Sequence, residues 1–482
     1  MTGGASPLSL GAAAQEYGEQ PALMFADGEL SYGELATVVL PRAERLVSLG
    51  VDQLALSAEP KQEPLLWIFA AIEAGVSLVL LHPRWSSAER EAALAQVPSA
   101  LLLDEALAPG GELRDESWLD QSRAYMGQRR SACGADVIDI DEEDCLAVVF
   151  TSGSSGRPRG VVLSRRAMIA AAQASAARLG WDEQDRWLVS LPLAHLGGFA
   201  ILVRVLMAGR CAVLAPLYSS PDELMALAAQ RRVTLMSVVP TQLRALIEVG
   251  ERPPGSVRAV LVGGAACPAT LQRKARSLSW PLLLTYGMTE TCGQVATVEP
   301  GSSLQHPQGV GRPLSGFTVT LDAGEICISG PSLLSGILGQ EESVLDGQGR
   351  LRSGDLGRFT AAGELLVLGR LDQVINSGGE KVHPGEIEEQ IRSCPQVEEV
   401  CVVGLVDERW GQQVAAAIQW RRSAASSALD GLETALAEQL APWKRPRRWL
   451  EVAELPILAS GKVDRVAVTA LFAEPGGTGE SS

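Results

Sequence analysis

Apolar runs that alternate with helical segments are the feature that most limits how this chain can fold. Between residues 187 and 262 the runs 187–191, 211–215, 233–239 and 257–262 are separated by segments with helical periodicity. The runs are continuously apolar rather than alternating, which is typical of parallel strands that are covered on both faces. The same rhythm occurs over 62–108. We therefore predict an α/β fold whose large part contains two parallel-rich sheets flanked by helices.

The pattern of predicted helices and strands changes twice along the rest of the chain. From about residue 295 short strands and Gly/Pro turns follow one another, which predicts a small antiparallel, barrel-like subdomain that ends near Gly369. Because 482 residues are too many for one ordinary core, we expect two domains. These are a large N-terminal domain over 1–371 and a small, mobile α+β domain over 372–482. The Gly/Ser/Glu tail from about 474 is expected to be disordered.

The run Leu65 to Leu81 resembles a membrane span but is interrupted. A span needs about 20 apolar residues, whereas this run carries Glu73 and Gly75 near its middle. We predict a buried helix that ends at Ala74, a stop at Gly75 and a buried strand from Ser77, and therefore no membrane span.

Net charge and cysteine spacing restrict the partners and the compartment. A net charge of −16 argues against general binding to nucleic acid or to anionic membranes. None of the eight cysteines is spaced as CxxC, and most lie in apolar runs, so we expect reduced thiols and a cytoplasmic location. The first twenty residues lack a basic region followed by an apolar core, so no signal peptide is expected.

The stretch Thr151 to Gly160 (TSGSSGRPRG) follows the apolar run Cys145 to Phe150. Hydroxyls, free amides and arginines donate hydrogen bonds to phosphate oxygens, and glycines let a ligand approach the backbone closely. The stretch lacks the Gly-Lys-Ser/Thr ending of the common nucleotide loop. Its composition fits a phosphate cradle and an ordinary Gly/Ser surface turn equally well.

Five further motifs follow in the chain, and each alone also fits an ordinary turn, linker or solvated tip. Glu290, within TYGMTETCG, is a lone carboxylate of the kind that anchors Mg²⁺ beside phosphates. Asp355, within RSGDLG, has the oxygens to accept hydrogen bonds from both ribose hydroxyls. The remaining motifs are VGGAA (262–266), GRLDQVINSGGEKVHPGEIE (369–388) and LPILASGKVDR (455–465).

The six motifs in this order resemble those of the acyl-adenylate-forming enzymes, which include the AMP-forming acyl- and aryl-CoA ligases. The resemblance covers most of the chain and implies ATP, Mg²⁺ and coenzyme A as cofactor and co-substrates. It implies that Thr151, Ser152, Gly153, Ser154, Ser155 and Gly156 hold the ATP phosphates, and that Gly263, Gly264, Ala265, Tyr286 and Gly287 surround the adenine. It further implies that Thr289 contacts the α-phosphate, that Asp355 and Arg370 bind the ribose, and that Glu290 holds the metal.

The resemblance also implies the catalytic and conformational residues. The expected catalytic groups are Lys462, Glu290, Arg159 and His195, the hinge is Asp372, and Gly378 with Gly379 lines the path of the thiol. The chain departs from the family pattern at three positions. Arg159 and Ser155 replace the usual lysine and threonine of the phosphate loop, and Asn376 replaces a basic residue of the hinge motif.

The acid substrate is expected to bind along residues 187–209, near His195, Phe199 and Arg204. This segment contains no Asp or Glu to pair with an ammonium group, which argues against amino acids as substrates. Arg204 is the only full charge inside an apolar helix and therefore needs a partner. A second carboxylate or a carbonyl of the substrate and an internal ion pair remain equal alternatives.

Two segments resemble those of the o-succinylbenzoate-CoA ligases of menaquinone or phylloquinone synthesis, namely SLPLAHLGGFAILVRVL and SGGEKVHPGEIE. The resemblance implies an aromatic dicarboxylic keto-acid as substrate. The alternatives are another acyl- or aryl-CoA ligase, an acyl-AMP ligase that loads a carrier protein, and a regulatory protein that binds nucleotide without catalysis. The expected partners are a small carboxylic acid, ATP and coenzyme A, with no nucleic acid, and a homodimer is left open.

Overall fold

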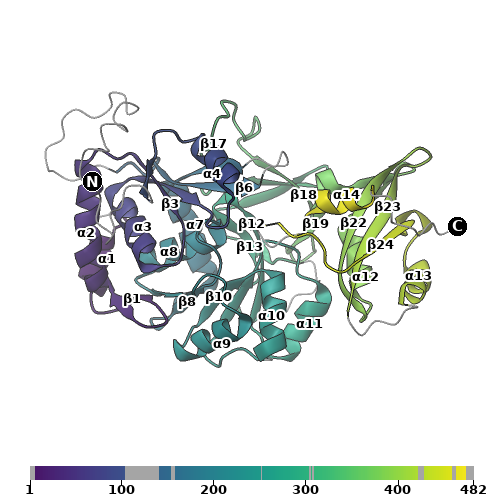
Figure 1. Ribbon diagram of the computed structural model, residues 1–482, viewed down its shortest axis with the longest axis horizontal. Helices are drawn as coiled ribbons and strands as arrows, with labels where there is room; N and C mark the ends of the chain where they lie inside the picture. The colour runs from purple at the N-terminus through teal and green to yellow at the C-terminus, as the bar shows by residue number, and fades with distance from the viewer. Residues whose placement is uncertain are drawn as a thin grey trace.

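The chain forms a large lobe and a small lobe (Figure 1). The computed structural model describes residues 6–103, 140–152, 158–250, 252–302, 306, 309–421, 428–458 and 463–473. The tail from about 474, which is predicted to be disordered, lies outside the described residues.

A mixed sheet of nine strands, counted over the described residues, forms one layer of the large lobe. Strands β12, β11, β10, β8, β9 and β1 pair in parallel, while β2, β13 and β14 join antiparallel at the two edges. In sheet order the strands are β14 (Arg312–Pro313), β13 (Gly293–Thr297), β12 (Leu282–Met288), β11 (Ala259–Val262), β10 (Leu235–Val238), β8 (Arg186–Val189), β9 (Cys211–Leu214), β1 (Pro21–Met24) and β2 (Glu29–Ser31).

A second sheet, with six strands in the described part of the chain, forms another layer. Strands β6, β4, β3 and β5 are parallel, and β7 and β17 extend the sheet antiparallel. In order the strands are β17 (Gly336–Ile337), β7 (Pro158–Ser164), β6 (Cys145–Ser152), β4 (Ser77–Leu81), β3 (Gln53–Ser57) and β5 (Leu101–Leu102). The prediction of two parallel-rich sheets is therefore confirmed.

Helices fill the space between the two sheets and cover their outer faces. Helix α7 (Arg165–Leu179) contacts β6, β7 and β13, and α8 (Leu196–Ala208) contacts β8, β9 and β13, so this pair lies between the sheets. The remaining helices of the lobe are α1 (Leu10–Tyr17), α2 (Tyr32–Ser48), α3 (Gln62–Ala74), α4 (Ser87–Leu94), α9 (Pro221–Gln230), α10 (Pro240–Gly250) and α11 (Ala269–Ser277).

The local signals of the sequence mark most of these boundaries correctly. Ser31 and Ser86 each close a capping box with a glutamate three residues later. The apolar run from Leu65 forms helix α3, which ends where Gly75 adopts a left-handed conformation with φ 70°, and strand β4 follows. Among the described residues, no helix combines the length and the apolar character that a membrane span requires.

Two helices near the ends of the described residues are short. Helix α1 has 8 residues and α14 (Arg465–Leu471) has 7. A helix of two turns shows too little periodicity to stand out, and its stability comes mainly from tertiary packing. Asp464 caps α14 by accepting hydrogen bonds from the amides of Val466 and Ala467.

A four-stranded antiparallel sheet, counted over the described residues, follows the two large sheets. Its strands are β15 (Thr318–Asp322), β16 (Glu325–Ser329), β18 (Leu351–Phe359) and β19 (Leu365–Arg370). The sheet leads the chain from the core of the large lobe to its junction with the small lobe, as predicted for the segment that ends near Gly369 (Figure 1).

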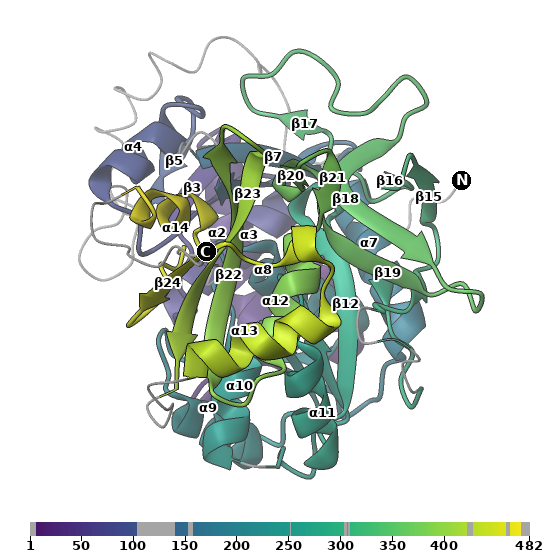
Figure 2. The ribbon, with the colours of Figure 1, turned by 90° about the vertical axis from the view of Figure 1, so that its right-hand side faces the viewer.

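The small lobe is built on a sheet of β20 (Ile375–Ser377), β21 (Glu380–Val382), β22 (Val397–Asp407), β23 (Gly411–Trp420) and β24 (Arg448–Val452). Helices α12 (Pro384–Arg392) and α13 (Ala428–Gln439) pack on one face, and α14 packs on the other (Figure 2). The clusters of buried apolar residues in the large lobe end at Leu365, and those of the small lobe begin at Ile375. The predicted domain boundary at 371/372 lies between these cores.

Two glycines after helices differ in what surrounds them, which gives a test of the packing. Gly50 and Gly75 have φ of 63° and 70°, but a Cβ at Gly50 meets nothing within 4 Å, whereas one at Gly75 would lie 3.0 Å from Ile140 Cγ1. We expect Gly50→Ala to cost about 1 kcal/mol from the left-handed backbone alone. Gly75→Ala should cost about 1–2 kcal/mol more because the side chain of Ile140 must shift. Urea unfolding midpoints measure both, and equal shifts would contradict the packing at Gly75.

Candidate active site

The predicted phosphate stretch joins β6 to β7, which pair antiparallel so that Thr151 lies opposite Arg159. The Thr151 hydroxyl donates to the carbonyl oxygen of Arg159 over 3.4 Å. Gly153, Ser154, Ser155 and Gly156, as well as the side chain of Ser152, lie outside the described residues.

Arg159 reaches across to Glu290, which joins two motifs that are far apart in the sequence. Its Nη2 atom lies 2.5 Å from Glu290 Oε1. Glu290 lies in the short 3₁₀ turn Thr289–Thr291 that follows β12, and its carbonyl oxygen accepts a hydrogen bond from the amide of Leu334 over 2.8 Å. The carboxylate is mostly buried, with 16% of the side chain exposed, while Arg159 is 44% exposed. The more exposed guanidinium is thus the partner with more room to move when an anionic ligand enters.

Glu290 fits a magnesium ion that is held mainly by ATP. No group of three or more His, Cys, Asp or Glu that could hold a metal ion occurs among the described residues. A site with one carboxylate suits Mg²⁺, which usually keeps water and substrate phosphate as its other ligands.

Tyr286, Asp355 and Arg370 form a second polar cluster beside the first. The Tyr286 hydroxyl donates to Asp355 Oδ2 over 2.7 Å, and Arg370 Nη1 lies 3.6 Å from Asp355 Oδ1. Asp355 and Arg370 are direct neighbours across β18 and β19. Burial first and then the charge of Asp355 raise the pKa of Tyr286, so its hydroxyl remains a donor at neutral pH.

Gly354 makes room for this cluster and is not among the residues predicted from the sequence. Its φ is 70°, and a Cβ there would lie 3.0 Å from Arg370 Nη2. The signal available in the sequence was a glycine that directly precedes the aspartate of a ligand-binding motif on a strand.

The predicted adenine residues lie at the ends of β11 and β12. Gly263, Gly264 and Ala265 follow β11 directly, and Gly264 has φ 79°. A Cβ at Gly263 would lie 2.8 Å from Thr285 Cγ2, so this strand end stays open only if the residue is small. A Cβ at Gly287 would lie 1.8 Å from the carbonyl oxygen of Gly293, so β12 and β13 could not pair as they do with any other residue there.

Helix α8 carries the three residues predicted to contact the acid. His195 is the N-cap residue of the helix, Phe199 is fully buried in the core, and Arg204 is 6% exposed. The Arg204 guanidinium lies 5.2 Å from the centre of the Trp187 ring, and a Cβ at Gly293 would lie 3.5 Å from its Nη2 atom. Arg204 therefore extends toward the turn that carries Glu290.

The internal ion pair considered for Arg204 does not occur within the described part of the chain. None of its nitrogens lies within 4.0 Å of a described carboxylate, and its Nε atom has no hydrogen-bond partner there. Burial lowers the pKa of Arg204 to about 10, which expresses the cost of holding an uncompensated cation in the protein interior. The internal ion pair is therefore not found among the described residues, and the contact of Arg204 with the substrate stays a prediction.

His82 lies beside His195, with 5.0 Å between the ring centres, and is not among the residues predicted from the sequence. It is 6% exposed, and its Nδ1 accepts a hydrogen bond from the amide of Arg84 over 3.1 Å. Burial and the charge of Arg84 lower its pKa, which favours a neutral imidazole. A cavity of about 170 Å³ opens beside it, lined also by Ser190, Pro192 and Tyr218. The available signal was a histidine directly after an apolar strand.

The predicted hinge and thiol-path residues lie at the start of the small lobe. Asp372 is exposed and pairs with Arg370 over 3.1 Å. Gly378 and Gly379 form the two-residue turn between β20 and β21, with φ of 63° and 90°, so the hairpin itself favours glycine at both positions. Lys462 lies outside the described residues, although Ile457 and Val463 on either side of it form a β-bridge.

Comparison with known proteins places this geometry among related chains. Residues 10–338 match the model of the AMP-binding enzyme family, and residues 386–462 match that of the AMP-binding enzyme C-terminal domain. A 2-succinylbenzoate--CoA ligase of Bacillus licheniformis is 31% identical over 474 residues, which cover 93% of this chain and 96% of the relative.

Two solved structures of o-succinylbenzoate CoA synthetase (MenE) from Bacillus subtilis are also similar. The complex with ATP and magnesium ion has a TM-score of 0.81 and 29% identity and covers 94% of this chain and 97% of that one. A double mutant bound with its product analogue OSB-NCoA has a TM-score of 0.67 and 30% identity and covers 96% and 97%. The two structures are of one enzyme and have nearly equal coverage. The higher TM-score of the ATP complex therefore means that the arrangement of this chain is closer to that complex.

The buried charge of Arg204 predicts that removing it stabilises the ligand-free protein. A cation whose pKa is lowered on folding destabilises the folded state at every pH below that pKa, so the cost is fully present at pH 7. We expect Arg204→Met to raise the free energy of unfolding by about 1–3 kcal/mol.

Arg258 supplies the control for this measurement. Its Nε donates to Asp185 Oδ1 over 2.8 Å, and the hydrogen bonds to this carboxylate raise the pKa of Arg258. A cation whose pKa is raised on folding stabilises the folded state at pH 7, so Arg258→Met should lower stability. Urea unfolding without substrates compares the two variants, and a loss of stability in Arg204→Met as large as that in Arg258→Met would contradict the assignment.

Proposed function

The chain belongs to the AMP-binding enzyme family, and on that premise we propose that it joins a carboxylic acid to coenzyme A through an acyl-adenylate. The observation that carries the proposal is the convergence at the end of β12, where Tyr286 meets Asp355 and Glu290 meets Arg159. This convergence offers contacts for a ribose and for phosphates within five residues of one strand end.

The first half-reaction needs cationic groups because two anions must meet. A carboxylate is a poor acylating agent because its leaving group would be oxide. Attack of its oxygen on the α-phosphate of ATP would form an acyl-AMP and break the bond to the β-phosphate, which releases pyrophosphate. AMP then becomes the leaving group of the next step. Arg159 would give up its ion pair with Glu290 and neutralise the charge of the phosphates instead. Lys462, assigned from the family motif, would bridge the carboxylate and the α-phosphate. Thr289 would donate its hydroxyl to the α-phosphate. Magnesium bound at Glu290 would supply further charge neutralisation on the phosphates.

The remaining nucleotide contacts follow from the same cluster. Asp355 would accept hydrogen bonds from the ribose hydroxyls, with Arg370 beside it fixing the carboxylate. The adenine would lie against Tyr286 and the small residues Gly263, Gly264 and Ala265, where the open strand end admits a flat ring. Ligands of open α/β sheets commonly bind at such carboxyl ends of the strands.

The acid that the site fits best is o-succinylbenzoate, an aromatic dicarboxylic keto-acid. One carboxylate would react, and the other would pair with the Arg204 guanidinium, which has no carboxylate partner among the described residues. The names of the relatives support this acid. His195 and His82 would lie near the acyl group, and burial favours a neutral His82.

The second half-reaction transfers the acyl group to a thiol. The small lobe would turn about Asp372, and the thiolate of coenzyme A would pass the Gly378-Gly379 turn, form the carbon–sulfur bond and release AMP. A cytoplasmic location is consistent with the seven free cysteines of the described residues. Whether two copies associate stays a prediction that a measurement of molecular mass in solution would test.

Pyrophosphate release over a panel of acids, with coenzyme A present, tests the proposed function. We expect turnover with o-succinylbenzoate to exceed that with benzoate or a fatty acid by at least about 100-fold, as a buried charge pair would provide. Lys462→Ala serves as the control for adenylation and should abolish the release. Equal turnover with all acids would contradict the substrate, and unchanged release in Lys462→Ala would contradict the mechanism.

A double change of enzyme and substrate tests the role of Arg204. The changed substrate is an analogue of the keto-acid that keeps the carboxylate that reacts with ATP and lacks the other carboxylate. Wild-type enzyme should prefer o-succinylbenzoate over this analogue by about 100-fold in kcat/KM, and Arg204→Met should lose most of that preference while its KM for ATP stays the same. A preference that survives in Arg204→Met would place the second carboxylate elsewhere.

A further inference from the structure

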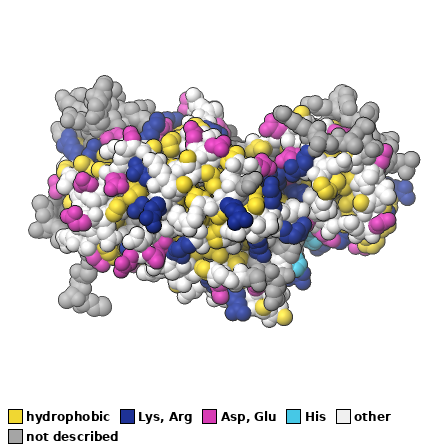
Figure 3. Space-filling view, turned by 90° about the horizontal axis from the view of Figure 1, so that it is seen from below, with side chains coloured by type: hydrophobic (Ala, Val, Ile, Leu, Met, Phe, Trp, Pro, Cys, Tyr) yellow, Lys and Arg dark blue, Asp and Glu magenta, His cyan; other side chains and the backbone are white. Residues whose placement is uncertain are grey.

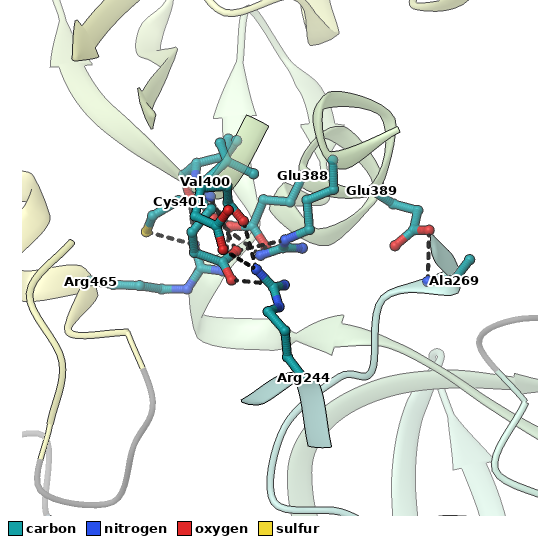
Figure 4. A network of polar contacts seen from close by, with 11 residues as sticks. Arg244, Ala269, Glu388, Glu389, Val400, Cys401 and Arg465 are labelled. Atoms are coloured by element: carbon teal, nitrogen blue, oxygen red, sulfur yellow. Dashed lines mark hydrogen bonds and ion pairs between the residues drawn. The ribbon is translucent and has the colours of Figure 1, made fainter. Parts of the chain in front are cut away.

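Two polar contacts join the small lobe to helices of the large lobe (Figure 4). From α10, Arg244 Nη1 donates to the carbonyl oxygen of Glu398 over 2.8 Å and to its Oε1 over 3.1 Å, and Arg244 Nη2 lies 3.6 Å from Glu399 Oε2. These side chains are between 22% and 28% exposed. One guanidinium therefore contacts three acceptors of the small lobe in a setting that is partly shielded from water.

The second contact supplies a missing helix cap. The N-cap residue of α11 is Pro268, which has no side-chain oxygen and makes no cap hydrogen bond. Glu389 of the small lobe instead accepts a hydrogen bond from the amide of Ala269, the first residue of the helix, over 3.1 Å. A carboxylate at this position satisfies a free amide and interacts favourably with the helix dipole. Helix α11 thus receives this cap from the other lobe, and it keeps the cap only while the lobes have this orientation.

The contact of Arg244 continues into the small lobe as a chain of alternating charges. Arg392 Nε lies 2.7 Å from Glu399 Oε1, and Arg392 Nη2 lies 3.6 Å from Glu388 Oε2. The buried Glu388 then pairs with Arg465 over 2.6 Å. Arg465 begins α14 and follows Lys462 by three residues. Figure 4 shows this path from Arg244 through the cluster to Arg465.

We propose that Arg244 and Glu389 form a two-point clasp that holds the small lobe in the orientation seen here, and that Arg244 is a positioning residue for adenylation. The assignment to adenylation rests on the proposed function. It follows from the charge chain that ends at Arg465, three residues after Lys462 in the sequence. The arrangement of this chain is also closer to that of the relative's ATP complex than to that of its complex with a product analogue. The clasp must open for thioester formation.

Separate measurement of the two half-reactions tests the clasp. In Arg244→Met, pyrophosphate release in a single turnover without coenzyme A should slow about fivefold, the size expected for a partly exposed charge pair. Transfer from preformed acyl-adenylate to coenzyme A should keep its rate or become faster. Equal slowing of both half-reactions, or of neither, would overturn the proposal.

Arg421 is the matched control, because it also pairs with Glu398, over 3.1 Å, but lies within the small lobe. Arg421→Met should leave both half-reactions within about twofold of wild type. Glu389→Ala should act like Arg244→Met, whereas Glu389→Gln keeps an acceptor oxygen for the amide of Ala269 and should stay near wild type. A rate loss in Arg421→Met equal to that in Arg244→Met would assign the effect to the small lobe alone and overturn the clasp.

A readout without catalysis separates this proposal from the proposed function. Hydrogen–deuterium exchange of a peptide over 267–277 reports the first turn of α11, which Arg244 itself does not cap. Exchange should rise in Arg244→Met and not in Arg421→Met, because loss of one contact weakens the other through the lobe orientation. Unchanged exchange in Arg244→Met overturns the clasp whatever the activity. Absence of adenylation by the wild type, with exchange behaving as expected, would overturn the proposed function instead.

Discussion

The close approach of Gly287 to the carbonyl oxygen of Gly293 is the contact on which the site depends. Strand β12 is parallel to β11 on one side and antiparallel to β13 on the other, so the direction of the sheet reverses here. The reversal is tight because a Cβ at Gly287 would lie 1.8 Å from that oxygen. It turns Glu290 toward Arg159 of the other sheet and leaves Tyr286 facing Asp355. The same turn brings Gly293 next to Arg204.

Three arginines near this turn differ in how their charge is balanced, and the difference suggests that each contacts a different part of the substrates. Arg159 pairs with Glu290 and is half exposed, so a phosphate can compete for it. Arg370 is held by Asp355 and Asp372 and has a fixed place beside the proposed ribose site. Arg204 is buried without a carboxylate partner among the described residues. A protein retains a costly charge of this kind where function requires it, which agrees with the proposed contact to the acid.

The junction between the lobes is polar, and this suits an interface that must form and break. Seen from below, Lys and Arg side chains gather where the large and small lobes meet (Figure 3). The apolar cores on the two sides are separate. Contacts such as Arg244 with Glu398 and Glu389 with α11 specify an orientation by geometry and charge without burying a large apolar area. Polar interfaces of this kind permit relative motion of the domains they join.

The sequence by itself determined the elements and the inventory of chemical groups. Helix α7 begins after Ser164 and ends before Gly180, and both residues are local signals that can be read from the sequence. The motifs around Glu290, Asp355 and Arg370 were identified from residue order and family resemblance.

Only the tertiary structure decided which groups meet. Arg159 and Glu290 are 131 positions apart in the sequence, and nothing local predicts that they pair. The structure also removed the internal ion pair of Arg204 from the alternatives within the described residues, and it revealed His82, Gly354 and the contact of Arg244 with Glu398. Pairing across sheets and lobes depends on packing between distant segments, which local periodicity and capping cannot specify.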